Sequence, residues 1–152
     1  NPRKRRHSVK AGEVQVGLVS GFGFNSSCAV GTTVAHDCHQ MIVVGTDDAL
    51  MAQAANELAR MGGGQVVIRE GDAIARVELP IAGLMSNEPA DIVAENAESI
   101  LEGFRACGCT LNNANMTMSL LALAVIPELR ISDLGLVDVT KFELTPVLTA
   151  AE

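Results

Sequence analysis

The chain has 152 residues, enough for one compact domain with a single hydrophobic core. Apolar residues make up 48% of it. No run reaches the roughly 18 consecutive apolar residues of a membrane span, and no segment resembles a secretory signal. We therefore expect a soluble protein with no membrane partner. The formal net charge is −7, and the absence of Trp and Tyr leaves Val, Ile, Leu, Ala and Met to fill the core.

The first twelve residues differ from the rest in charge. They hold Arg3, Lys4, Arg5, Arg6, His7 and Lys10, and the remainder of the chain is acidic. A basic run can bind nucleic acid, but neither aromatic stacking residues nor a basic groove accompanies this one. We therefore interpret 1–12 as a solvated connector to upstream sequence and 13–152 as the folded domain, with no nucleic-acid partner.

In the first half of the chain the apolar pattern predicts strands at 14–19, 28–35 and 41–44, with a glycine turn at 21–25. The period then changes to that of a helix capped by Thr46 and ended by Gly62-Gly63-Gly64. Its apolar stripe consists of Leu50, Met51, Ala54, Ala55 and Leu58. The segments 65–69 and 73–79, separated by Glu70-Gly71-Asp72, predict a β-hairpin.

The second half predicts two more helices and several short strands. Ser86 or Asn87 can cap a helix that stops at Gly108, with Glu88 and Pro89 in its first turn. A buried helix is expected from Met116 to Val125. Short extended pieces follow at 129–131, 136–139 and 142–144. Together the elements predict an α+β fold, a mainly antiparallel mixed sheet with about three flanking helices.

The four cysteines, Cys28, Cys38, Cys107 and Cys109, show neither a Cys-x-x-Cys pair nor the spacing of a zinc quartet. Reduced thiols in a cytoplasmic protein are the simplest interpretation.

The segment with the most reactive side chains is VAHDCHQ at 34–40. Imidazole can bind a transition metal or transfer protons near neutral pH, and a carboxylate can orient it. His36 and His39 would share a face on a helix but point to opposite faces on a strand, and the neighbouring segments read as strands. A turn whose polar groups satisfy one another is the main alternative to a metal site. A contribution to catalysis or substrate binding also stays open, because such loops often carry function.

Several common site motifs are excluded. Gly62-Gly63-Gly64 follows a helix and precedes a strand, which reverses the order that a phosphate-binding loop needs, so we interpret it as a helix stop. The chain has no Gly-x-Ser-x-Gly nucleophile elbow. It also lacks the His-x-Glu and Pro-Cys-x-x-Cys motifs of the zinc-dependent cytidine deaminases.

Seven segments carry a family resemblance. They are GLVSGFG (17–23), TVAHDCHQMIVVGT (33–46), GGG (62–64), LPIAGLMS (79–86), LAL (121–123), VIPEL (125–129) and GLVD (135–138). In this order they closely resemble the carboxy-terminal domain of microbial adenine deaminases, and Arg6-His7 matches the Arg-His expected before the first strand. The resemblance covers nearly the whole chain.

The resemblance implies a longer parent protein of the amidohydrolase superfamily, a cyclic-amidine hydrolase that converts adenine to hypoxanthine and ammonia in purine salvage. A binuclear manganese or iron site in an upstream (β/α) barrel would activate water. This chain alone is then expected to hold no metal and to be inactive. Its expected partners are the upstream barrel, adenine in the full-length enzyme, and further copies in a homo-oligomer.

The sequence departs from the family pattern at three positions. The family usually has Ser where this chain has Cys38, which argues against Cys38 as an obligatory ligand. Phe24 stands where Leu is commoner, and Gln40 where Asn is common, so an amide contact at 40 is in doubt.

Because they form a polar cluster between apolar strands, we take His36, Asp37 and His39 as candidate accessory residues that face the barrel mouth implied by the resemblance and enclose or orient adenine. The alternatives are an interface or internal hydrogen-bond network at these residues. For the whole domain, they are a structural or oligomerising module and an independent metal- or ligand-binding domain.

Overall fold

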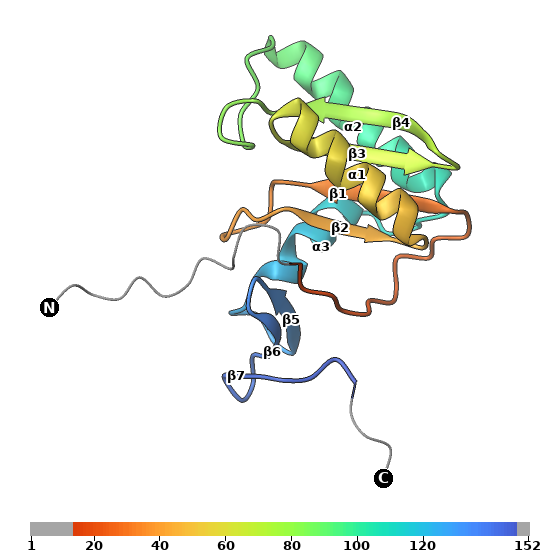
Figure 1. Cartoon of the computed structure of the whole chain (residues 1–152). Helices are drawn as coiled ribbons and strands as arrows, with labels where there is room; N and C mark the ends of the chain where they lie inside the picture. Colours follow the sequence, from red (N-terminus) through yellow and green to blue (C-terminus); the bar gives the residue numbers. More distant parts are fainter. Residues whose placement is uncertain (1–13, 149–152) are drawn as a thin grey trace, which may run out of the picture. The chain divides into compact units, whose positions relative to one another are not determined.

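A computed structural model describes residues 14–148, and the connector predicted at 1–12 lies outside them. The described chain forms two compact units, which we treat separately (Figure 1). The larger unit spans 19–122, and the smaller one combines 14–18 with 123–148.

The larger unit is built on a four-stranded sheet. Its strands are β1 (Cys28–Thr32), β2 (Ile42–Gly45), β3 (Gly64–Arg69) and β4 (Asp72–Glu78). Their order across the sheet is β2-β1-β3-β4, and each neighbouring pair is antiparallel. The predicted hairpin 65–79 is confirmed as β3–β4, with a bulge where Val67 and Ile68 pair with Ala75 and Ala73.

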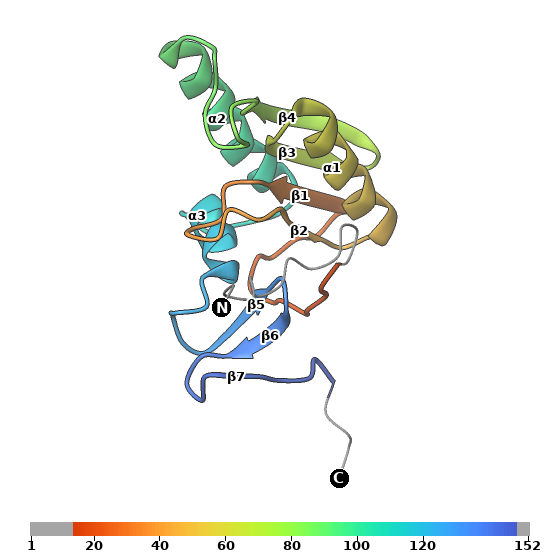
Figure 2. The same cartoon turned by 60° about the vertical axis from the view of Figure 1, so that its left-hand side comes forward.

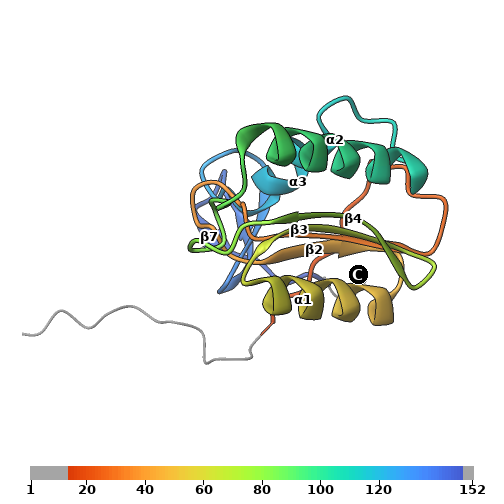
Figure 3. The same cartoon turned by 90° about the horizontal axis from the view of Figure 1, so that it is seen from above.

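Helices cover both faces of this sheet (Figure 3). They are α1 (Asp48–Met61), α2 (Ala90–Ala106) and the short α3 (Ala114–Ser119), which continues into the 3-10 turn η1 (Leu120–Ala122). Alternate strand residues enter two separate cores. Val30 and Val67 pack with Phe104 of α2, whereas Ala29 and Val66 pack with Leu58 of α1. The unit is therefore a three-layer arrangement of helix, sheet and helix.

The smaller unit contains a three-stranded antiparallel sheet of β5 (Leu129–Ser132), β6 (Gly135–Asp138) and β7 (Glu143–Leu144). These strands confirm the extended segments predicted near the carboxy-terminus. After β6, hydrogen bonds from the side chains of Thr140 and Lys141 lower the pKa of Asp138 to about 2. The predicted α+β class, with antiparallel sheets and three helices, is confirmed. Within residues 14–148, none of the helices combines the length and apolar character needed to cross a bilayer.

Both predicted helix caps are wrong by one or more residues. Asp47, in extended conformation, caps α1 by accepting a hydrogen bond from the Leu50 amide at 3.0 Å. Thr46 instead accepts from the Cys28 amide and donates to the Ser26 carbonyl, which ties β2 to the start of β1. At α2, Pro89 is the N-cap residue and makes no side-chain capping bond. Ser86 forms a local turn by accepting from the Glu88 amide, a bond that competes with capping.

Two further predictions are corrected. Residues 14–19 form no strand, and Val14 and Leu18 are largely exposed, so their alternation lacks the partner strand that would fix it. The helix predicted for 116–125 ends at Ala122, and the Ser119 hydroxyl donates to the Met116 carbonyl, a bond that competes with helical continuation.

The four thiols fall into two environments. Cys28, Cys107 and Cys109 lie in the core between the sheet and α2, and Cys38 is exposed. Burial, reinforced by a hydrogen bond with Cys28, raises the pKa of the Cys107 thiol to about 12. A thiol that stays protonated is a poor nucleophile, because the thiolate is the reactive form.

We therefore predict that a thiol reagent at pH 8 labels one cysteine of the folded 152-residue chain rapidly, and that peptide mapping identifies it as Cys38. The other three should react only when the chain unfolds. Cys38→Ser, which removes the exposed thiol, should abolish the rapid phase. Labelling of Cys107 at the rate of Cys38 without unfolding would contradict the buried environment described here.

Candidate functional site

The predicted site residues lie at one end of the four-stranded sheet, which we call the loop end and define as 33–41, 62–64 and 79–86. In the antiparallel register, Thr32 pairs with Ile42 and Gln65, and Gly64 pairs with Glu78. β1 and β4 therefore leave the sheet where β2 and β3 enter it. Figures 1 and 2 both show the loop after β1 and the loop after β4 on the same side of the sheet.

His36, Asp37 and Cys38 form a tight turn rather than part of a strand or helix. The His39 amide donates to the Ala35 carbonyl at 2.5 Å, and His39 adopts a left-handed conformation with φ of 46°. The turn brings the imidazoles of His36 and His39 edge to face, with ring centroids 5.4 Å apart. The sequence alternative of opposite strand faces is therefore wrong, and the two rings form one group.

The polar side chains of the turn are exposed or half-buried, and the residue before the turn is buried in the core. Asp37 and His39 are exposed, His36 is half-buried, and Ala35 beneath them is fully buried. The exposed Cys38 thiol lies 3.7 Å from the Ala122 carbonyl and donates to it, which links the turn to η1. The arrangement offers two imidazoles and one carboxylate to a neighbouring molecule or domain.

The donor set is too small for a complete metal site in the described part of the chain. Among residues 14–148, no group of three or more His, Cys, Asp and Glu side chains lies close enough to hold a metal ion. Neutral imidazole presents one hydrogen-bond donor and one acceptor, and a carboxylate presents acceptors. His36, Asp37 and His39 can therefore donate and accept hydrogen bonds.

Thr33 connects the three segments of the loop end. Its hydroxyl accepts a hydrogen bond from the Gly64 amide at 2.8 Å and donates to the Gly83 carbonyl at 2.6 Å. Its own amide donates to the Gly64 carbonyl at 2.9 Å. One side chain thus joins the strand that leads into the histidine turn, the glycine turn and the loop after β4.

The glycine turn is confirmed as a helix stop. Gly62, with φ of 77°, ends α1, and the Gly63 amide donates to the Leu58 carbonyl. The turn also allows two backbones to touch, because a Cβ added at Gly63 would collide with the Gly83 Cα. Sequence reasoning missed Thr33 and Gly83. Thr33 lies inside the strand predicted at 28–35, which in the structure ends at Thr32, and Gly83 lies within the family segment LPIAGLMS.

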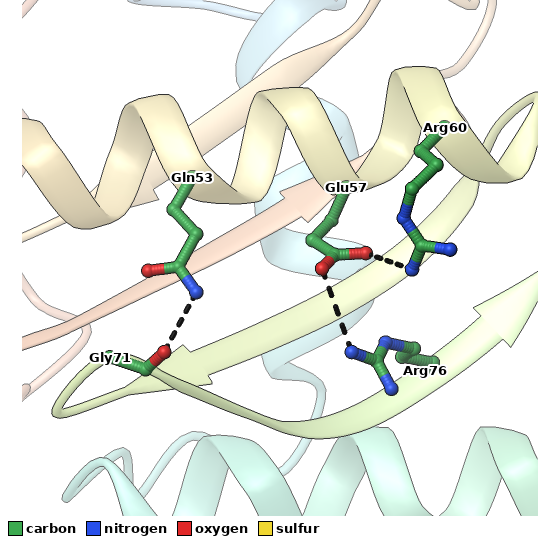
Figure 4. Close-up of polar contacts among 5 residues, drawn as sticks. All are labelled: Gln53, Glu57, Arg60, Gly71 and Arg76. Carbon is green, nitrogen blue, oxygen red and sulfur yellow. Dashed lines mark hydrogen bonds and ion pairs between the residues drawn. The ribbon is translucent and has the colours of Figure 1, made fainter.

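Two surface hollows lie away from the histidine turn. One, of about 460 Å³, runs along α1 beside Gln53, Glu57 and Arg60. Figure 4 shows why its charges are satisfied: Glu57 pairs with both Arg60 and Arg76, and Gln53 donates to the Gly71 carbonyl. The hydrogen bond from Arg60 lowers the pKa of Glu57. The second hollow follows α2 at 105–112. Neither is lined by His36, Asp37 or His39.

Comparison with known proteins identifies the family to which the sequence is similar. A family model described as "Adenine deaminase C-terminal domain" matches residues 4–143. The chain is 60% identical over 143 residues to adenine deaminase 3 of Rhizobium meliloti and 61% identical over 143 residues to adenine deaminase of Paracoccus denitrificans. It is 46% identical over 138 residues to the adenine deaminase of Moorella thermoacetica. These matches cover 94%, 94% and 91% of the chain but 24%, 24% and 23% of the relatives, so the chain spans about a quarter of their length.

The close approach of Gly63 and Gly83 generates a stability prediction. Gly63→Ala should lower the free energy of unfolding by about 2 to 4 kcal/mol, because the new methyl group collides with backbone and the residue keeps a positive φ. Gly71→Ala is the matched control, since Gly71 also has positive φ but nothing lies within 4 Å of the position that a methyl group would take there. We expect it to cost about 1 kcal/mol. Equal losses in denaturant unfolding would show that the close approach contributes nothing.

Proposed function

Because the chain belongs to the adenine deaminase C-terminal domain family, we propose that it forms the C-terminal part of an enzyme that hydrolyses adenine to hypoxanthine and ammonia. The relatives that it matches are named adenine deaminases and are about four times longer. The reaction replaces the exocyclic amino group of adenine with an oxygen atom taken from water. We place that chemistry in the upstream part of the polypeptide.

The proposed catalytic metal, a binuclear manganese or iron centre, belongs to that upstream part as well. The described residues of this chain provide no group of three ligands, so we assign the metal ligands to the upstream part of the polypeptide. Bound upstream, such a centre would supply an activated water. The contribution of this chain is then to binding and enclosure.

The observation that carries this proposal is the pair of imidazoles on the exposed turn at the loop end. We propose that the domain packs on the upstream barrel so that His36, Asp37 and His39 help to close the substrate site. Adenine presents ring nitrogens that accept hydrogen bonds and an amino group that donates them. An imidazole N–H can donate to a ring nitrogen, and the Asp37 carboxylate can accept from the amino group. These contacts would orient the ring for attack by water.

The first test compares the full-length parent with this 152-residue chain, both supplied with manganese and adenine. We expect hypoxanthine and ammonia from the parent and none from the chain, because the metal ligands are assigned upstream. Activity in the chain alone would overturn that assignment. An inactive parent would overturn the proposed reaction.

The second test replaces the histidines within the full-length parent. His36→Ala and His39→Ala should each lower kcat/KM about tenfold or more, equivalent to about 1.4 kcal/mol of transition-state stabilisation. The thermal midpoint should change little, because His39 is exposed and His36 is only half-buried.

Asn56→Ala is the control for this second test, since Asn56 is an exposed polar residue on the outer side of α1, away from the turn. Unchanged kinetics with unchanged stability in both histidine variants would leave the domain with a structural or oligomerising role only. One ion bound per chain and lost with His36→Ala would instead indicate an independent metal site.

A further inference from the structure

The two ends of the four-stranded sheet differ in charge. At the end opposite the loop end, the turns 25–27, 46–48 and 70–72 carry four carboxylates, Asp47, Asp48, Glu70 and Asp72, all exposed. The loop end, at 33–41, 62–64 and 79–86, holds one formal charge, that of Asp37, when histidine is neutral, and the exposed Glu78 adjoins it at the end of β4. A surface with so few charged groups loses less hydration when another protein surface covers it.

The loop end also exposes large apolar side chains. Ile81 and Met85 in the loop after β4 are 45% and 58% exposed, and Met41, the residue before β2, is 43% exposed. Methionine adapts its shape to a partner surface because its side chain is unbranched and flexible.

The backbone that carries Ile81 and Met85 is held by hydrogen bonds. The amides of Ile81 and Met85 each donate to the other residue's carbonyl at 3.1 Å, and Thr33 holds the loop between them through the Gly83 carbonyl. A surface that is already ordered loses less conformational entropy when it binds. The ordered backbone distinguishes Ile81 and Met85 from exposed apolar residues on segments without such hydrogen bonds.

We propose that the loop end is the face by which this domain docks onto the upstream part of the same polypeptide. This inference rests on the proposed function, because the relatives indicate that about three quarters of the protein lies outside this chain. α1 and α2 already cover the two faces of the sheet. Docking through Met41, Ile81 and Met85 would set the histidine turn beside the upstream domain.

Hydroxyl-radical footprinting of the full-length protein, read by mass spectrometry, tests this without substrate. Ile74 on β4 is a matched internal reference, because it is 44% exposed within the chain and Ile81 is 45% exposed. We expect Ile81 to be labelled at least threefold more slowly than Ile74, with Met85 protected as well. Equal labelling of the two isoleucines would overturn the proposal.

The same measurement distinguishes whether the upstream domain or a second copy of the protein covers the loop end. Protection of Ile81 that persists in the monomeric fraction from size-exclusion chromatography supports docking within one polypeptide. Protection that disappears on dissociation assigns the face to a subunit interface and overturns the proposal.

A pair of variants provides a second, independent readout. Ile81→Asp should speed the proteolytic release of the C-terminal domain from the full-length protein several-fold, whereas Ile74→Asp should leave the rate unchanged. Equal release rates would count against docking at the loop end. Neither readout uses adenine. Protection of Ile81 in a protein that does not deaminate adenine would therefore contradict the proposed reaction and still support docking at the loop end.

Discussion

The loop end depends on the Thr33 hydroxyl, which accepts from the Gly64 amide and donates to the Gly83 carbonyl at the same time. Removing it would leave two partly buried backbone groups without these partners, at a cost of about 1 to 3 kcal/mol for each unsatisfied group. The bonds hold Gly63 against Gly83 at a distance that no side chain would permit. His36 follows Thr33 by three residues, so the position of the histidine turn is set by the same constraint.

The sheet itself could be predicted from local pattern. Glu70-Gly71-Asp72 between two apolar runs defines the β3–β4 hairpin, and the helical spacing from Leu50 to Leu58 defines α1. Predictions failed where the outcome depends on a competing local bond or an absent partner. Thr46 and Ser86 are both good caps in isolation, but each makes a different backbone hydrogen bond here. The alternation at 14–19 has the period of a strand and no neighbour to pair with in the described structure.

The candidate site was predictable in its residues but not in its surroundings. The density of His36, Asp37 and His39 is visible in the sequence, whereas the left-handed His39 that brings the two imidazoles together is not. The contact between Thr33 and Gly83 spans fifty positions and exists because β1 and β4 leave the sheet at the same end. Such a contact follows from strand order, which no local pattern encodes.

If the loop end both docks on the upstream domain and presents the imidazoles, the two roles are coupled. His36 and Ile81 stand on segments that Thr33 joins, so a shift of one segment moves the other. Binding adenine through imidazoles that are in place only when the domains are docked would make substrate affinity depend on docking. Linkage then requires the reverse effect, so adenine would tighten the contact between the domains. Substrate is not expected to change how tightly a purely structural module contacts its neighbour. The reciprocal effect therefore distinguishes a structural role of the domain from a role in substrate binding.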